Sequence, residues 1–158
     1  MISNHSIPNF SNAIRSFFFE TGFKEFVVRG GSMSPLIEHG QKVTCIPCSS
    51  PLTKGRCYVY VADGVLVVHR LVDMNDTNAE FIGDNTCRRH TILLEQIIGE
   101  PAIRENRFRR LIIHLINYIF IKVAGTVPKA GAIRSCLVKA TDAILPLGEC
   151  YGKSKITL

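Results

Sequence analysis

The spacing of hydrophobic residues predicts a short helix near the N-terminal end of the chain. Within residues 10–21, apolar side chains recur at helical spacing, at Phe10, Ala13, Ile14, Phe17 and Phe18. Ser11 or Asn12 lies near the expected start of the helix, and Gly22 follows its expected end. The segment is too short and too polar to span a bilayer, which takes about 20 apolar residues.

Between residues 24 and 104 the pattern changes to that of β-strands. Segments rich in Val and Ile, separated by glycine or by clusters of Pro and Ser, lie at 24–29, 42–47, 56–62 and 65–73. Residues 62–65, Ala-Asp-Gly-Val, are typical of a tight hairpin turn between two of these strands. Shorter strands are expected at 79–82 and 96–103. Because strand follows strand with no helix between them, we predict a mainly β, antiparallel fold rather than alternating βαβ units.

Beyond residue 104 the chain becomes basic and then apolar. Arginines are concentrated in residues 104–110, an apolar segment follows at 111–127, and residues 131–145 are expected to form a helix that ends before Pro146. These patterns divide the chain into a β domain with its N-terminal helix, residues 1–104, and a helical C-terminal extension, residues 105–158.

Composition places the chain among ordinary globular proteins. It has 158 residues, of which 46% are hydrophobic and 20% charged, which excludes a disordered chain. The formal charge is 19 − 13 = +6, which fits binding to nucleic acid, an anionic membrane surface, or solubility alone. The six cysteines do not resemble a secreted disulfide framework, and residues 1–8 lack the pattern of a signal peptide. We therefore expect a cytoplasmic protein.

Three short motifs carry residues capable of catalysis. Residues 30–35 read Gly-Gly-Ser-Met-Ser-Pro, residues 67–71 read Val-Val-His-Arg-Leu, and residues 81–85 read Phe-Ile-Gly-Asp-Asn. Each motif alone is more typical of a turn, or of a histidine at the edge of a core, than of an active site. Their order and spacing, with His69 placed 69 − 32 = 37 residues after Ser32, favour an active site over these structural interpretations.

In this order, the motifs resemble the signal peptidase I superfamily of serine peptidases, which also contains self-cleaving repressor domains. The resemblance runs from about residue 27 to 103, about half of the chain, and includes Gly40, Gly55 and the Ile-Ile-Gly at 97–99. Most bacterial leader peptidases have lysine at the position of His69. The histidine resembles the branch found in endoplasmic-reticulum, archaeal and spore-former enzymes, and in small soluble homologues linked to maturation of ribosomally made peptides. The resemblance implies a signal-peptidase-like antiparallel β domain.

The resemblance also implies a role for each site residue. Ser32 would be the nucleophile, His69 its general base, and Asp84 the group that orients the imidazole. The choice of base is chemically sound, because neutral imidazole accepts a serine proton near pH 7. The backbone N–H of Ser32 would stabilise the oxyanion, and Met33 and Pro35 would bind the substrate.

Departures from the family pattern concern the oxyanion hole and the third catalytic residue. Leader peptidases often have a second serine where this chain has Gly30, so one oxyanion donor is missing. The endoplasmic-reticulum branch has a second aspartate shortly after its Gly-Asp-Asn, whereas residues 86–90 here read Thr-Cys-Arg-Arg-His. Asp84 is therefore the sole candidate for that role.

The predicted function is that of a serine endopeptidase that cuts a peptide or protein precursor after small residues, as in removal of a leader or signal, without a cofactor. One alternative is a catalytically inactive module that binds peptides. Another is a basic, nucleic-acid-associated regulator of the repressor-like class, although no helix-turn-helix fits before the β region and nucleic acid is not expected.

Two pairs of residues have the spacing of zinc ligands. Cys45 and Cys48, and Cys87 and His90, have ligand-like spacing. Pro47 interrupts the first pair, and nothing else resembles a zinc-binding fold, so no metal is expected.

The apolar segment 111–127 bears on location. Its 17 residues include His114, Asn117 and Lys122, which places it at the short limit of a membrane span. We expect a partly buried or surface-lying helix instead, with residues 105–127 contacting either the periphery of a membrane or a partner protein.

Overall fold

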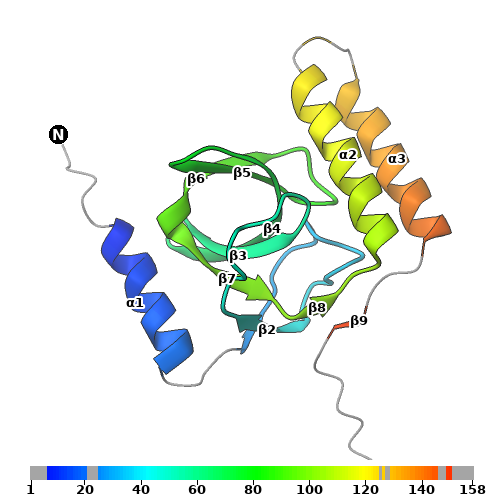
Figure 1. The fold of residues 1–158 in the computed structure, drawn as a ribbon. Helices are drawn as coiled ribbons and strands as arrows, with labels where there is room; N and C mark the ends of the chain where they lie inside the picture. Colours follow the sequence, from blue (N-terminus) through cyan, green and yellow to red (C-terminus); the bar gives the residue numbers. More distant parts are fainter. Residues whose placement is uncertain (1–6, 21–24, 125, 127–128, 146–148, 151–158) are drawn as a thin grey trace, which may run out of the picture.

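A curved antiparallel sheet forms the centre of the protein (Figure 1). The computed structural model describes residues 7–20, 25–124, 126, 129–145 and 149–150. The sheet has seven strands in the order β1-β2-β7-β3-β4-β5-β6. They are β1 (Glu25–Val27), β2 (Lys42–Ile46), β3 (Cys57–Ala62), β4 (Val65–Met74), β5 (Asn78–Ile82), β6 (Arg89–Leu93) and β7 (Ile97–Pro101). All of their pairings are antiparallel, so the predicted mainly β class is confirmed.

The central feature of the sheet is the β3–β4 hairpin. Its strands pair from Ala62↔Val65 back to Cys57↔Arg70. The turn residues Asp63 and Gly64 have φ angles of 51° and 75°. Positive φ at both positions matches the twist of a two-residue hairpin, which explains why Asp-Gly stands there. The predicted hairpin turn is confirmed.

Hydrophobic clusters cover both faces of the sheet. On β3, Val59 and Val61 enter one cluster, with Met33, Ile98 and Phe18. Tyr58 and Tyr60, which alternate with those valines, enter a second cluster that includes Leu71, Phe81 and Ile92. Because both faces are covered, β3 reads as a continuous apolar run rather than as an alternation of apolar and polar residues.

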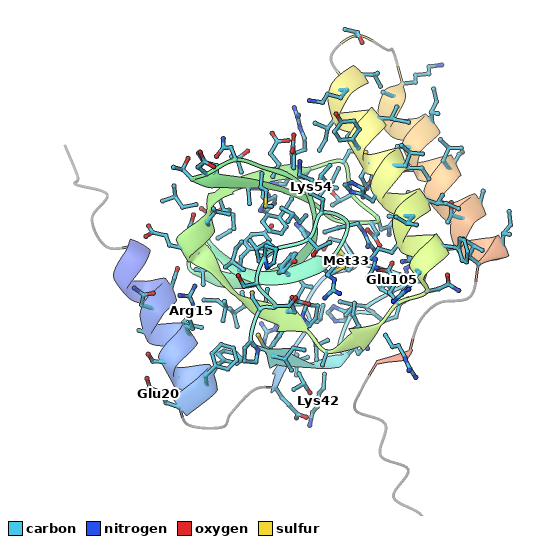
Figure 2. The ribbon with its side chains drawn as sticks, in the orientation of Figure 1. Arg15, Glu20, Met33, Lys42, Lys54 and Glu105 are labelled. Atoms are coloured by element: carbon cyan, nitrogen blue, oxygen red, sulfur yellow. The ribbon has the colours of Figure 1, made fainter. Side chains whose placement is uncertain are left out.

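Helix α1 (Ile7–Glu20) packs on one side of the sheet, close to the predicted range 10–21. The side chain of Phe18 enters the first cluster. Arg15 points from the helix toward the sheet (Figure 2) and donates to the carbonyl oxygens of Glu95 and Ile97. These residues belong to the 3₁₀ turn η1 (Leu94–Gln96) and to the start of β7.

Helices α2 (Arg107–Val123) and α3 (Ala130–Ile144) form a hairpin on the other side of the sheet (Figure 1). α2 begins four residues before the predicted apolar segment, because the Asn106 side chain accepts from the N–H groups of Phe108 and Arg109 and caps the helix. Phe120 and Ala130 pack on Val72 and Ile82 of the sheet. Among the described helices, none has the length and hydrophobicity needed to cross a bilayer.

Two details differ from the sequence-based expectation. Strand β6 was not predicted, because the residues at its start, Arg89 and His90, are polar and continue a polar run from Thr86. The predicted strand 96–103 divides into β7 and β8 (Ile103–Arg104), and β8 pairs with β9 (Glu149–Cys150) outside the main sheet.

Candidate active site

Ser32 and His69 meet beside the open end of the β3–β4 hairpin. Ser32 lies in the turn that follows β1, and His69 lies on β4. The Ser32 Oγ atom is 3.0 Å from Nε2 of His69, which is hydrogen-bond distance. The imidazole is only 4% exposed, whereas Ser32 is half-buried. The structure thus brings together the two residues expected to act as nucleophile and base.

The turn that carries Ser32 is held by the turn of the third motif. The N–H of Asn85 donates to the carbonyl of Ser32 at 2.7 Å, and the Asn85 side-chain amide donates to the carbonyl of Gly31 at 3.3 Å. A Cβ atom at position 83 would lie 2.6 Å from the carbonyl oxygen of Ser32, so the two turns can approach only because Gly83 has no side chain. The Gly-Asp-Asn motif therefore positions Ser32 through hydrogen bonds from Asn85 to the backbone carbonyls of Gly31 and Ser32.

The backbone N–H of Ser32 is available for an oxyanion. Among the described residues it donates to no protein acceptor, whereas the neighbouring Ser34 N–H is engaged with the carbonyl of Gly31. An unengaged N–H on the nucleophile itself is the donor used in oxyanion holes. This arrangement is compatible with the role expected for the Ser32 backbone.

Tyr60 occupies the other side of the imidazole. Its hydroxyl is 3.0 Å from Nδ1 of His69. Burial raises the pKa of Tyr60, so the hydroxyl stays neutral at physiological pH. When the hydroxyl oxygen accepts the Nδ1 proton, Nε2 is left with a free lone pair toward Ser32. Tyr60 was not among the residues predicted from the motifs.

The imidazole lies in a surrounding that disfavours its charged form. Burial lowers the pKa of His69 to about 4, and the charges of His90 and Arg88 act in the same direction while Asp84 opposes them. The ring of His90 packs edge-on at 5.0 Å between ring centroids and lines a neighbouring cavity of about 680 Å³. His69 is therefore neutral over the whole physiological pH range.

Asp84 contacts arginine rather than the imidazole. Its two carboxylate oxygens accept from Nε and Nη2 of Arg70 at 2.8 and 2.6 Å, and Arg109 lies at 3.5 Å. Burial alone would raise the pKa of Asp84, but the charges of Arg70, Arg109 and Arg134 outweigh it and lower that pKa. The expected contact from Asp84 to His69 is thus replaced by an ion pair, because the side chain of Arg70 points to the opposite side of β4 from His69.

A buried network of ions joins this part of the sheet to the helices. Arg70 also binds Glu105 at 2.8 Å, and Arg109 binds Glu105 and, at 2.8 Å, Asp142 of α3. Glu105 lies where the chain enters α2 (Figure 2). Arg70 and Arg109 are fully buried.

A third buried arginine, Arg134 of α3, donates to the carbonyl of Gly83 at 2.6 Å and to the Asn117 side chain at 2.9 Å. The helical extension therefore contacts the same turn that holds Ser32.

A groove of about 500 Å³ begins at the nucleophile. It is lined by the end of β1 and the residues after it, by Ser32 and Met33, and by the first four residues of β4: Phe26, Val27, Val28, Arg29, Val65, Leu66, Val67 and Val68. Met33 is in the groove as expected and is 2% exposed. Pro35, the other expected substrate residue, is half-buried and is not among the lining residues.

Two of the cysteines with ligand-like spacing lie in different surroundings. Cys45 is buried in the core, and Cys87 is exposed, with its thiol near the carbonyl of Gly131. In the part of the chain that the structure describes, no group of three or more His, Cys, Asp or Glu side chains is arranged to bind a metal ion.

Comparison of the chain with protein-family models, with curated protein sequences and with solved structures found no match. The geometry of the site and the motif resemblance therefore carry the functional proposal.

Proposed function

We propose that this protein is a serine endopeptidase of the signal-peptidase type, with Ser32 as nucleophile and His69 as general base. The observation that carries the proposal is the 3.0 Å contact from Ser32 Oγ to Nε2 of a buried, neutral histidine. A hydroxyl next to an uncharged imidazole is the minimal arrangement for nucleophilic catalysis. Its place at the end of an apolar groove supports a peptide substrate.

The chemistry follows from these contacts. Ser32 Oγ attacks the scissile carbonyl while its proton passes to Nε2 of His69, and the negative charge that develops on the carbonyl oxygen is stabilised by the Ser32 N–H. The imidazolium then returns that proton to the leaving amine, which leaves an acyl-enzyme. A water molecule, deprotonated by His69, attacks the ester, and the carboxylic product leaves with Ser32 restored.

The strand arrangement supports binding of the substrate as an added strand. β4 pairs with β5 only from Arg70 onward, so residues 65–69 have an unpaired edge among the described residues. Within the part of the chain that the structure describes, β1 pairs only with β2, and its residues Phe26 and Val27 line the same groove. An extended peptide in the groove could bond to either edge. Small side chains before the cut remain the expectation from the motif resemblance.

The substrate class that fits is a peptide or protein precursor, with removal of a leader as the reaction, and we place this activity in the cytoplasm. An inactive peptide-binding module would use the same groove, and catalysis distinguishes the two. A nucleic-acid-associated regulator fits less well, because the buried arginines Arg70, Arg109 and Arg134 are engaged inside the protein and unavailable to phosphate.

The direct test is to incubate the purified protein with a proteome-derived peptide library and to identify new termini by mass spectrometry. We expect cleavage after small residues without any added cofactor. Peptides that bind the protein and remain intact would instead support the binding module, and the absence of both would contradict the proposal.

The pH dependence of cleavage should reflect the buried base. Because imidazolium cannot accept the Ser32 proton, kcat/KM is expected to fall only as the pH drops through about 4, instead of near 6.5 as for an exposed histidine. The measurement is a pH profile of kcat/KM, with circular dichroism at each pH to exclude acid unfolding. A half-maximal rate near the ordinary histidine pKa in folded protein would contradict the lowered pKa of His69, whereas a rate that does not change with pH down to about 3 would contradict His69 as the base.

Removing the Tyr60 hydroxyl should slow the reaction without abolishing it. Tyr60→Phe keeps the ring in the core but deletes the partner of Nδ1, so kcat is expected to fall about fivefold, the equivalent of one hydrogen bond of about 1 kcal/mol. KM should be unchanged, since the hydroxyl does not reach the groove. The matched control is Tyr58→Phe, because Tyr58 lies in the same cluster as Tyr60 but its hydroxyl accepts from the N–H of Thr53. Equal kcat losses in both variants would remove Tyr60 as a positioning residue.

A further inference from the structure

The α2–α3 hairpin exposes an unusual amount of hydrophobic surface. On α2, Phe108 is 71% exposed and Leu111 is 61% exposed, and on α3 Ile144 is 78% exposed. The other exposed apolar residues of the two helices are Ile112, Leu115, Tyr118, Ile119, Ile133 and Leu137. They recur at helical spacing, so each helix packs one face on the protein and has a second apolar face uncovered. Exposed apolar rows of this kind mark an interaction site.

All of the exposed charged side chains on and next to the described part of the hairpin are basic. The exposed charged side chains of residues 104–145 are Arg104, Arg107, Lys122, Lys129 and Lys139. The two carboxylates in this range, Glu105 and Asp142, are bound to buried arginines. The ammonium group of Lys122 lies 5.4 Å from the centre of the Tyr118 ring, beside the apolar row. The apolar surface is therefore bordered by cations and by no free anion among the described residues.

This combination favours a lipid surface over a second copy of the chain. Pairing of two such hairpins would bring like charges together, which is unfavourable. Rows of aliphatic side chains bordered by Lys and Arg, with a tyrosine near the polar edge, are typical of helices that lie in the interface of an anionic bilayer. Each exposed cation adds attraction to anionic headgroups.

We propose that the α2–α3 hairpin binds to the surface of anionic membranes, with its apolar rows in the headgroup region. The hairpin lies on the bilayer and does not span it, in agreement with the length and polarity of α2. The inference is independent of the peptidase proposal, because it uses neither Ser32 nor His69.

The test is sedimentation of the full chain with vesicles of phosphatidylcholine, with and without phosphatidylglycerol. We expect binding to the mixed vesicles, weaker binding to the neutral ones, and release by salt. The double variant Leu111→Glu/Leu115→Glu should lose binding at least about tenfold. Arg107→Gln/Lys122→Gln, which keeps the apolar rows, should lose about fivefold per cation removed.

The control is Leu93→Glu, which alters an exposed leucine of β6 and should bind as the wild type. Circular dichroism confirms that each variant is folded. The proposal would be overturned if the protein did not bind to mixed vesicles or bound equally well to neutral ones. An equal loss of binding in Leu93→Glu would overturn it too. Dimers detected by light scattering and abolished by Leu111→Glu/Leu115→Glu, without vesicle binding, would assign the surface to a second copy and overturn it as well.

Discussion

Substitution of Ser32 by alanine is expected to reduce kcat/KM for peptide cleavage by a factor of about 10⁴ or more, because no other group can form the acyl-enzyme. The loss of stability should be small. Ser32 is half-buried in a turn, and its side chain has one described hydrogen bond, to His69. The measurements are kcat/KM on a peptide identified in the library and the midpoint of thermal unfolding.

Ser34→Ala is the matched control for this substitution. Ser34 lies two residues further along the same turn, and its hydroxyl bonds to Glu38 instead of His69. This variant should retain most of the activity. A Ser32→Ala protein that cleaves at the wild-type rate would show that catalysis occurs elsewhere, and equal losses in both variants would indicate damage to the turn.

Arg70→Met should destabilise the protein by about 3–5 kcal/mol, the usual cost of removing one partner from a buried ion pair. Arg70 is fully buried and binds Asp84 and Glu105. The variant therefore leaves these two carboxylates without the positive charge and the hydrogen bonds of the guanidinium group. Methionine is chosen because it retains most of the volume of the side chain. The free energy of unfolding is measured by urea titration at neutral pH.

An exposed ion pair that involves the same strand provides the comparison. Lys54 binds Asp73 of β4 at 2.5 Å, with 45% and 36% of the two side chains exposed. Lys54→Met should therefore change stability by less than about 1 kcal/mol. If Arg70→Met costs no more than Lys54→Met, the buried network does not stabilise the fold as we infer.

Much of the fold could be predicted from the sequence because its signals are local. The Val- and Ile-rich strands and the Asp-Gly turn depend on neighbours within a few residues, and the structure has them where they were expected. Strand β6 escaped prediction because polar residues at its start obscure the alternation. Its pairing with β5, including Phe81↔His90, is a tertiary contact that no local pattern reports.

The partners of the catalytic residues were also partly predictable. The hairpin turn fixes the pair Tyr60↔Val67, and His69 is two residues beyond Val67, so Tyr60 and His69 share one face as diagonal neighbours. The same alternation turns Arg70 away from His69 and toward Asp84. The motif resemblance implies that Asp84 orients the imidazole of His69. The alternation of side chains along β4 instead favours Arg70 as the partner of Asp84.

The contacts from the helices could not be predicted. Asp142 lies far along the chain from Arg70 and Asp84, and it meets Arg109 only when α3 docks against α2. Arg134 likewise reaches the carbonyl of Gly83 across the interface with the sheet. In the sequence, Asp142 and Arg134 are isolated charged residues within apolar segments. Such residues are also typical of the solvent-exposed face of a helix, so the sequence alone does not indicate that they are buried.

The contacts of Arg134 have a consequence for the order in which the active site is completed during synthesis. A ribosome that has added residue 104 has already made Ser32, His69 and Asp84, yet Glu105, Arg109 and Arg134 are still to come. Chains fold from the N-terminus as they emerge, so the nascent β domain has Arg70 without one of its two carboxylates and the Gly83 carbonyl without its donor. The turn that holds Ser32 therefore gains its contact with Arg134 only after α3 has left the ribosome, later than the synthesis of Ser32 and His69 themselves.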